Sequence, residues 1–360
     1  MRTVVCVAAL LWSAGCVEVA EERAKNEDRI GRRAAHGLTV QVDEGLAAVR
    51  ALEADRVELW AQAPTLTVRL TAAEAGPWTL DLRNAMPDAV LEGAPARPIG
   101  RSVPTHRSWR VDVPAGETTL RIAPPDAEDP SPWTFVAFAD VQDRLDGVQD
   151  LFGRMATEPG VRFGLISGDL TEQGDASTLR RFQRNMETLP FPLFATLGNH
   201  ELGADTASPP FHRLFGRGSF SFAYRGVRFT LLDSASATLA PRTYDKLDRW
   251  LAAGRDDLHL AMMHIPPLDA FGLRNGAFAS RGEAHKLLSL LARAGVDVTV
   301  YGHVHTFKAY TNVGIDAYIT GGGGAIPERL DGIGRHFMTF RAEPALARIV
   351  PGVVRIFPAD

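Results

Sequence analysis

The 360-residue chain has little cysteine. Its two cysteines, Cys6 and Cys16, both lie in the first sixteen residues. The rest of the chain therefore contains no disulfide and no cysteine ligand for a structural zinc site. Folds held together by disulfides or by zinc–thiolate modules are excluded for nearly the whole protein.

A strong excess of charge of either sign is also absent. Lysine and arginine together number 39 against 43 aspartates and glutamates, which gives a formal net charge of −4. A protein that binds long nucleic acids neutralises many phosphates with basic side chains, and binding of a single strand favours a basic segment lined with aromatic residues. Neither feature is present here. We therefore expect no nucleic acid partner.

Only the N-terminus resembles a targeting segment. Arg2 precedes an apolar run over residues 4–12, and small residues follow before Cys16. This pattern is typical of a secretory signal peptide and is too short for a stable membrane span. The ending Ala14-Gly15-Cys16 resembles a bacterial lipoprotein signal, in which the cysteine is acylated, and ordinary cleavage is the alternative. We expect an exported protein in the periplasm or at the outer membrane, attached through a lipid on Cys16.

Changes in composition divide the chain into segments. After the signal peptide (1–16), residues 17–37 are highly charged and predict a tether with solvated charges, either extended or partly helical. Over residues 38–125, apolar and polar residues alternate in six or seven short runs between glycines and prolines, which predicts a small all-β sandwich. The remaining segments are an acidic, proline-rich linker (126–132), a longer domain (133–345) and a C-terminal strand or tail (346–360).

Residues 133–345 have a different periodicity from residues 38–125. Short apolar runs alternate with amphipathic stretches, and they predict strands near residues 135–138, 163–166, 193–196, 229–232, 258–261 and 298–300, and helices near 148–155, 176–189, 243–253 and 283–294. Strands that are apolar throughout belong to sheets buried on both faces. We therefore predict an α/β domain with its functional residues beyond the carboxyl ends of the strands.

Polar residues that can bind metals follow several of these runs. In chain order they are Asp140, Gly168-Asp169, Gly198-Asn199-His200-Glu201, His264 and Gly302-His303-Val304-His305. A mixture of oxygen and imidazole ligands suits Mn, Fe, Zn or Co better than Ca. Five such motifs in this order predict a hydrolytic site with two metal ions.

The motif set resembles the calcineurin-like metallophosphoesterases, which include purple acid phosphatases and cyclic nucleotide phosphodiesterases. The resemblance extends over about residues 133–340. It implies a four-layer α/β/β/α sandwich, here preceded by the all-β domain. It also implies a metal-dependent phosphoric ester hydrolase with two divalent or trivalent ions. Purple acid phosphatases have an iron-binding tyrosine at the position of Glu172, so their Fe(III) centre is not expected here.

The resemblance also implies roles for individual residues. Asp169 would bridge the two metal ions, and His200 would stabilise the transition state or protonate the leaving oxygen while a metal-bridging hydroxide attacks phosphorus. The other ligands fall into a first group and a second group. The first group is Asp140, Gln142 and His305; the second group is Asn199, His264 and His303.

Two positions depart from the family pattern. Gln142 stands where the family has a histidine, and its amide either binds a metal or donates a hydrogen bond to a metal-bound water. Glu172 stands where many relatives have an aspartate, and it either forms an acid–histidine dyad with His200 or is a solvated carboxylate. At both positions, the choice between the two alternatives affects the expected rate of substrate turnover.

Other residues are weaker candidates. His212 and Arg213 follow the Asn-His motif and are candidates for phosphate contacts, as are Phe271, Asn275 and Arg281 after His264. Four consecutive glycines, Gly321 to Gly324, predict a turn or close packing, because no P-loop lysine follows them.

The leading functional prediction is therefore a phosphatase or phosphodiesterase for phosphomonoesters or small phosphodiesters. One alternative is a cell-surface protein that binds phosphoesters without turnover because Gln142 weakens the first group. A second alternative is an exported nuclease, which the charge balance disfavours. The pattern predicts no particular oligomeric state.

Overall fold

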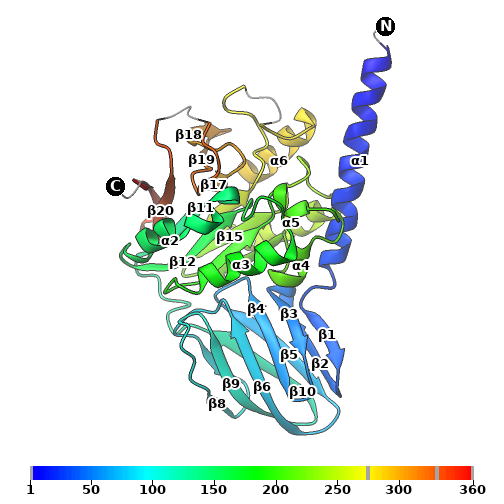
Figure 1. Cartoon of the computed structure of the whole chain (residues 1–360), viewed down its shortest axis with the longest axis vertical. Helices are drawn as coiled ribbons and strands as arrows, with labels where there is room; N and C mark the ends of the chain where they lie inside the picture. Colours follow the sequence, from blue (N-terminus) through cyan, green and yellow to red (C-terminus); the bar gives the residue numbers. More distant parts are fainter. Residues whose placement is uncertain (1–2, 273–275, 329–331, 358–360) are drawn as a thin grey trace.

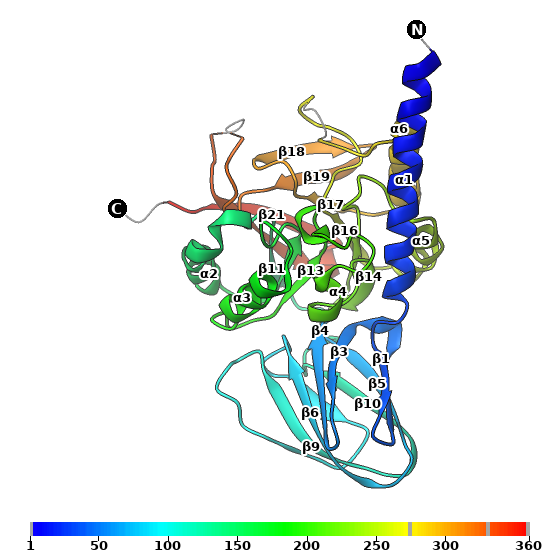
Figure 2. The ribbon, with the colours of Figure 1, turned by 45° about the vertical axis from the view of Figure 1, so that its right-hand side comes forward.

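The computed structural model describes residues 3–272, 276–328 and 332–357. These residues form an N-terminal helix, a β-sandwich and a larger α/β domain (Figure 1). Helix α1 (Thr3–Glu27) runs along the side of the α/β domain, and the sandwich lies at the end of the molecule away from the N-terminus (Figure 2). None of the described helices combines the length and apolarity that crossing a membrane requires.

The alternating segment builds two five-stranded sheets. One has the order β1-β2-β5-β10-β7 and the other β3-β4-β6-β9-β8. The strands are β1 (Arg32–Ala35), β2 (Leu38–Val42), β3 (Ala47–Leu52), β4 (Arg56–Ala61), β5 (Leu66–Ala72), β6 (Gly76–Arg83), β7 (Val90–Glu92), β8 (Ala96–Pro98), β9 (Arg107–Val113) and β10 (Gly116–Ala123). In β5, buried and more exposed residues alternate, as expected for a strand with one face in the core. The described sandwich thus has more strands than the six or seven predicted, because β1, β7 and β8 are too short to show a clear alternation.

The α/β domain contains two further sheets. The first has the order β13-β12-β11-β20-β21, and the second β14-β15-β16-β17-β19-β18. The strands are β11 (Trp133–Phe138), β12 (Val161–Ser167), β13 (Leu193–Thr196), β14 (Phe220–Tyr224), β15 (Val227–Leu232), β16 (Leu258–Met263), β17 (Val298–Tyr301), β18 (Phe307–Asn312), β19 (Ile315–Thr320), β20 (His336–Glu343) and β21 (Arg348–Arg355). The helices are α2 (Gln149–Ala156), α3 (Ala176–Met186), α4 (Pro210–Leu214), α5 (Pro241–Ala253) and α6 (Arg281–Arg293).

Aromatic side chains join the two sheets face to face. The ring of Phe229 on the second sheet lies 5.1 Å from that of Phe135 and 5.3 Å from that of Phe163, both on the first sheet. Helices α2 and α3 cover the outer face of the first sheet, where Phe152 packs between Phe138 and Phe182. Helices α5 and α6 pack on the second sheet. This arrangement confirms the predicted four-layer α/β/β/α sandwich, and every strand and helix predicted in this domain overlaps an observed one.

The sandwich contacts the amino ends of two strands of the first sheet. The side chain of Asn84 donates a hydrogen bond to the carbonyl of Leu193 and accepts one from its amide, at 2.8 and 3.0 Å. At the start of β12, Arg162 binds Asp88 of the sandwich and Asp126 of the predicted linker. Arg162 therefore connects both the sandwich and the linker to the α/β domain through charged contacts.

One predicted segment differs from the structure. The segment 17–37 is not a solvated tether, because Arg23 and Glu27 of α1 are buried against the α/β domain and β1 pairs with β2 in the sandwich. The sequence did not indicate this burial because the partners of these charged residues are distant in the chain. The predicted C-terminal strand is present as β21, which pairs with β20 along its whole length.

Candidate metal centre

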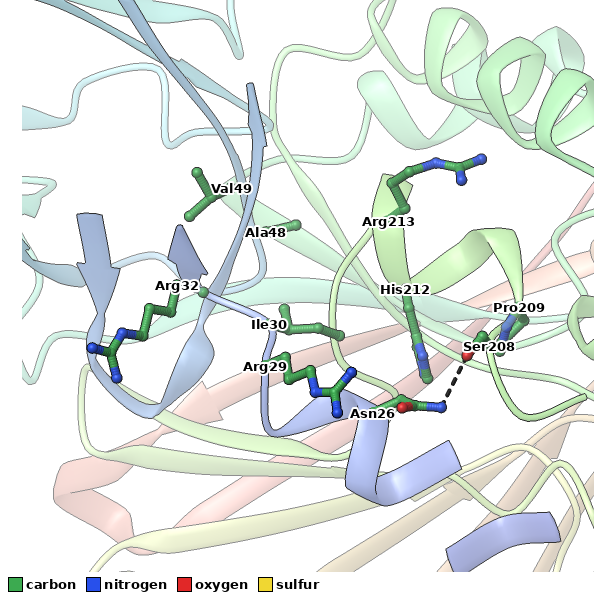
Figure 3. Close-up of a pocket in the computed structure, with 11 residues that line it drawn as sticks. Asn26, Arg29, Ile30, Arg32, Ala48, Val49, Ser208, Pro209, His212 and Arg213 are labelled. Atoms are coloured by element: carbon green, nitrogen blue, oxygen red, sulfur yellow. Dashed lines mark hydrogen bonds between the residues drawn. The ribbon is translucent and has the colours of Figure 1, made fainter. Parts of the chain in front are cut away.

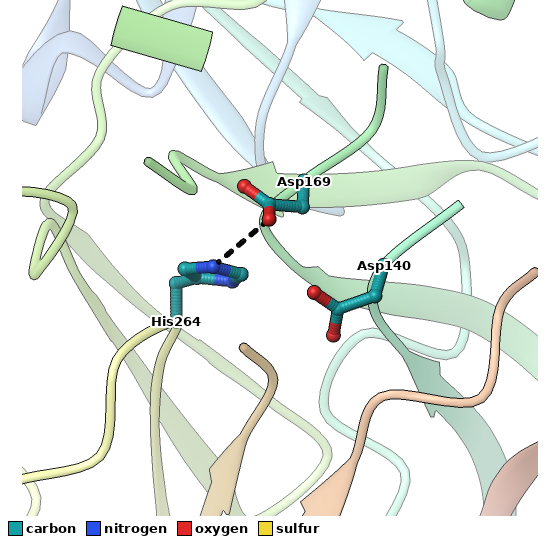
Figure 4. Close-up of side chains that lie close together, drawn as sticks. All are labelled: Asp140, Asp169 and His264. Carbon is teal, nitrogen blue, oxygen red and sulfur yellow. Dashed lines mark ion pairs between the residues drawn. The ribbon is translucent and has the colours of Figure 1, made fainter. Parts of the chain in front are cut away.

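Three predicted ligands meet at the carboxyl ends of three strands. Asp140 follows β11, Asp169 follows β12 and His264 follows β16. One potential ligand atom from each side chain lies within 4.8 Å of the others, and the side chains point toward one another (Figure 4). Their exposed fractions are 0%, 1% and 0%. Two carboxylates buried this closely require positive charge beside them.

The backbone at this cluster is held in an unusual conformation. Asp140, Gln142, Asp169 and His303 have φ angles of 62°, 44°, 52° and 69°. Residues other than glycine rarely adopt this left-handed region, and such strain is concentrated at functional sites. Gly198 completes the arrangement, because a Cβ atom there would lie only 2.1 Å from Oδ1 of Asp169.

Charge in the cluster is balanced by a histidine. Burial would lower the pKa of His264, but the neighbouring Asp169 carboxylate outweighs this and raises it to about 9. Burial would likewise raise the pKa of Asp169, but His264 holds it well below its usual range. Burial raises the pKa of Asp140 to about 6, with His264 opposing the rise and Asp169 adding to it. A protonated His264 therefore supplies the positive charge that a bound metal cation would otherwise supply.

The second ligand group converges on one amide oxygen. Oδ1 of Asn199 lies 3.0 Å from Nε2 of His264 and 2.9 Å from Nδ1 of His303. Nδ1 of His264 donates to the carbonyl of Ser167 at 2.6 Å. This bond fixes the ring, so that Nε2 becomes a metal-ligand nitrogen once its proton is displaced.

The first ligand group is also assembled. Nε2 of His305 lies 3.6 Å from Oδ1 of Asp140, and its Nδ1 donates to the carbonyl of Ile326 at 2.8 Å. The Gln142 amide nitrogen donates to Oδ2 of Asp169 at 2.8 Å and lies 3.2 Å from Nε2 of His305. Because rotating an amide by 180° exchanges its nitrogen and oxygen, Gln142 is placed for both predicted roles.

We expect Gln142→His to tighten metal binding at the first group if the amide oxygen is a ligand, because imidazole is the stronger donor. The expected gain is roughly tenfold, the scale on which changes around metal ligands alter affinity. Calorimetric titration with Mn²⁺ measures it. Gln142→Leu is the control, and it should weaken the same binding step. Unchanged affinity in both variants would assign Gln142 to hydrogen bonding alone.

His200 is oriented by a backbone carbonyl rather than by the predicted carboxylate. Its Nδ1 donates to the carbonyl of Glu172 at 2.6 Å, whereas Oε2 of Glu172 lies 3.7 Å away on a side chain that is 44% exposed. The predicted hydrogen-bonded dyad is therefore not formed. Burial would lower the pKa of His200, but the Asp169 carboxylate and the Glu172 carbonyl outweigh it and the pKa is raised.

No role was predicted for Glu201, although it belongs to the motif Gly198-Asn199-His200-Glu201. Its carboxylate is buried and accepts hydrogen bonds from the amides of Leu170, Thr171 and Gly198, at 2.9, 3.1 and 3.0 Å. Burial and the Asp169 charge raise the pKa of this carboxyl to about 8. Glu201 thereby ties the loop after Asp169 to the loop that carries Asn199. In the sequence, the position of this carboxylate directly after His200 was the feature that could have indicated its role.

The four glycines serve close packing, as predicted. A Cβ atom at Gly321 would lie 2.2 Å from the carbonyl oxygen of Val304. The amides of Gly323 and Ala325 donate to the carbonyls of Ala139 and Asp140 at 2.9 and 2.8 Å. The glycine run thus supports the backbone that presents Asp140.

The weaker candidates lie elsewhere. His212 and Arg213 line a cavity of about 360 Å³ at the end of α1 (Figure 3). Nε2 of His212 lies 3.3 Å from Oε1 of Glu27. They are not members of the metal cluster. The ammonium group of Lys308 lies over the ring of Phe271. Arg281 lines a separate pocket, which is formed by residues that follow His264 in the chain. Asn275 lies outside the described residues.

Comparison with known proteins agrees with this geometry. Residues 134–307 match the family model of calcineurin-like phosphoesterases, and no curated protein matches the chain. Among solved structures, PhoD is similar with a TM-score of 0.50 and 10% identity, over 81% of this chain and 87% of that chain.

Two other solved structures have lower TM-scores. GAP50, the anchor in the inner membrane complex of Plasmodium, has a TM-score of 0.48 and 14% identity, over 64% of this chain and 86% of that chain. A dimetal phosphatase from Danio rerio has a TM-score of 0.46 and 15% identity, over 62% and 99%. The family match over residues 134–307 and the clustered ligands agree that the α/β domain is similar to the calcineurin-like phosphoesterases, which are metal-dependent phosphoric ester hydrolases.

Proposed function

We propose that the chain hydrolyses phosphomonoesters or small phosphodiesters with two metal ions, one held by each ligand group. The observation that carries this proposal is the position of Asp169. Its Oδ2 lies 2.8 Å from the Gln142 amide nitrogen of the first group and 3.3 Å from Nε2 of His264 in the second. One carboxylate oxygen thus stands between both groups, as a bridging ligand must.

The residues fit metal ions in charge and in donor type. Asp140 and Asp169 are buried together, and the positive charge beside them is a proton on His264. A divalent cation can replace that proton and leave the imidazole neutral. Oxygen and imidazole donors favour Mn, Fe, Zn or Co. When bound, such ions polarise phosphoryl oxygens and provide a nucleophile from water near neutral pH.

The protein's own contribution to the reaction centres on His200. The Glu172 carbonyl fixes its ring, and its Nε2 lies 3.8 Å from Oδ2 of Asp169. The side chain is 28% exposed, in contrast to the buried carboxylates. His200 therefore stands between the metal ligands and solvent, where it can donate a proton to the leaving oxygen of a bound ester.

A second function is supported by one observation. The Gln142 amide is neutral and makes a hydrogen bond with Asp169, whereas the family has an imidazole at this position. A weakly held first ion would leave a protein that binds phosphoesters without turnover. This alternative predicts metal binding and ester binding in the absence of hydrolysis.

Metal analysis combined with two model esters tests the proposal. We expect the protein lacking residues 1–16 to bind two ions per chain after exposure to Mn²⁺, Fe²⁺, Zn²⁺ or Co²⁺, as measured by plasma mass spectrometry. It should then hydrolyse 4-nitrophenyl phosphate or bis(4-nitrophenyl) phosphate. Metal-loaded protein that hydrolyses neither ester would overturn the proposal in favour of the binding function.

A further inference from the structure

Arg23 of helix α1 is buried in the α/β domain. Its side chain has an exposed fraction of 0%, and its guanidinium donates to both carboxylate oxygens of Asp233, at 2.6 and 3.2 Å. Such two-pronged pairs are specific in geometry, and a buried charge that loses its partner is strongly destabilising. The pair therefore determines how α1 sits on the domain.

The same guanidinium connects two loops. It donates to the carbonyl of Thr206 and to Oγ of Ser236, both at 3.0 Å. Thr206 lies in the loop after His200, whereas Asp233 and Ser236 lie in the loop after β15. Arg23 thus holds together two loops from different sheets.

Both loops lead to ligands of the second group. The loop after β15 contacts the His264 segment, because Leu232 pairs with Met263 and Oγ of Ser234 accepts a hydrogen bond from the amide of Ile265 at 2.8 Å. Met263 and Ile265 are the neighbours of His264 in the chain. The Thr206 loop continues directly from Asn199 and His200.

Glu27 and Asn26 make further contacts in the same region. The buried Glu27 carboxylate accepts a hydrogen bond from the amide of Gly218 at 2.7 Å, and the Gly218 carbonyl accepts one from Oγ1 of Thr196 at 2.7 Å. Thr196 ends β13, just before Asn199. Asn26 donates to Oγ of Ser208 at 2.9 Å (Figure 3). The end of α1 is therefore part of the packing that supports Asn199.

We propose that Arg23 is a positioning residue that holds Asn199 and His264 in place for the second metal ion. This inference rests on the proposed function in assuming that the second group binds metal. Within the described residues, the hydrogen bonds from α1 to the α/β domain end on residues 206–219, 233–236 and α5. None of them reaches Asp140, Gln142 or His305 of the first group. Loss of Arg23 should therefore affect one ion and spare the other.

Titration of Mn²⁺ into the metal-free protein tests this selectivity. We expect Arg23→Gln to weaken one of the two binding steps at least about tenfold, the scale for residues that orient metal ligands. The step affected should not be the one that Gln142→His shifts, and the two effects should add in the double variant. Saturating Mn²⁺ should restore most of the lost turnover.

Arg242→Gln is the matched control. Arg242 of α5 binds Glu21 of α1 at 2.8 Å and also pairs with Asp28. Among the described residues, its side chain makes no hydrogen bond to either loop, so its loss should leave both steps within about twofold, like most surface ion pairs. If Arg23→Gln fails to fold, Arg23→Lys decides the question, because it keeps the charge and loses the two-pronged contact; it should weaken the same step. Equal weakening of both steps, or no weakening in folded protein, would overturn the proposal. Because the readout is metal affinity, it stays informative even if the wild type hydrolyses no ester.

Discussion

Asp169→Asn should slow hydrolysis of a model phosphoester by at least about 10²–10³-fold, the loss typical of removing one group that stabilises a transition state. The substitution keeps the size of the side chain and removes its charge. Oδ2 of Asp169 lies within 3.3 Å of a side-chain atom in each ligand group, so an uncharged amide should weaken both ions at once. Oδ1 accepts a hydrogen bond from the His200 amide at 3.0 Å, a contact that the asparagine oxygen can keep. The loop should therefore stay in place while metal binding fails.

Turnover and metal content of the same preparation measure this prediction. Asp143→Asn makes the same chemical change one residue after Gln142, on an exposed side chain, and should behave like the wild type. If Asp169→Asn keeps more than a tenth of the wild-type rate, a bridging role for Asp169 is wrong.

His200→Ala should lower kcat by about 10²–10⁴-fold, the usual contribution of a general acid or base. Its imidazole is not in either ligand group, so the bound metal should be unchanged. The variant thus separates loss of proton donation from loss of metal. A fall in metal content parallel to the fall in kcat would instead make His200 a ligand.

Glu172→Gln is the control for how His200 is oriented. Nδ1 of His200 donates its hydrogen bond to the backbone carbonyl of residue 172, which the substitution retains. We expect turnover within about twofold of the wild type, as for most changes to an exposed side chain. A loss as large as that of His200→Ala would show that the carboxylate moves into a dyad during catalysis.

Periodicity predicted most of the α/β domain, because its buried strands are continuously apolar and its helices are amphipathic. The hairpin of β14 and β15 was not predicted. Its turn places Arg225 and Gly226 at positive φ angles of 48° and 75°. Asparagine or aspartate before glycine is the usual signal for such a turn. Because Arg225 stands there instead, the sequence did not indicate the turn.

Six of the predicted ligands could be proposed from the type of residue that follows each apolar run, whereas Gln142 was proposed only from the resemblance to the family. Their supporting contacts could not. The partner of His200 is a backbone carbonyl, which no side-chain pattern identifies. The partner of Arg23 is 210 residues away in the chain, so a buried ion pair looked like part of a solvated charged segment. Burial of a charge is decided by tertiary packing, and sequence alone does not show it.

The docked helix changes the distance over which an anchor at the N-terminus could act. Fully extended, the predicted tether of residues 17–37 would reach roughly 70 Å. In the structure, Cys16 and Arg23 lie on one continuous helix, and seven residues of helix rise only about 10 Å. If Cys16 carries a lipid, this short and rigid helical connection would keep the α/β domain next to the bilayer. The domain could then reach only substrates close to the membrane surface.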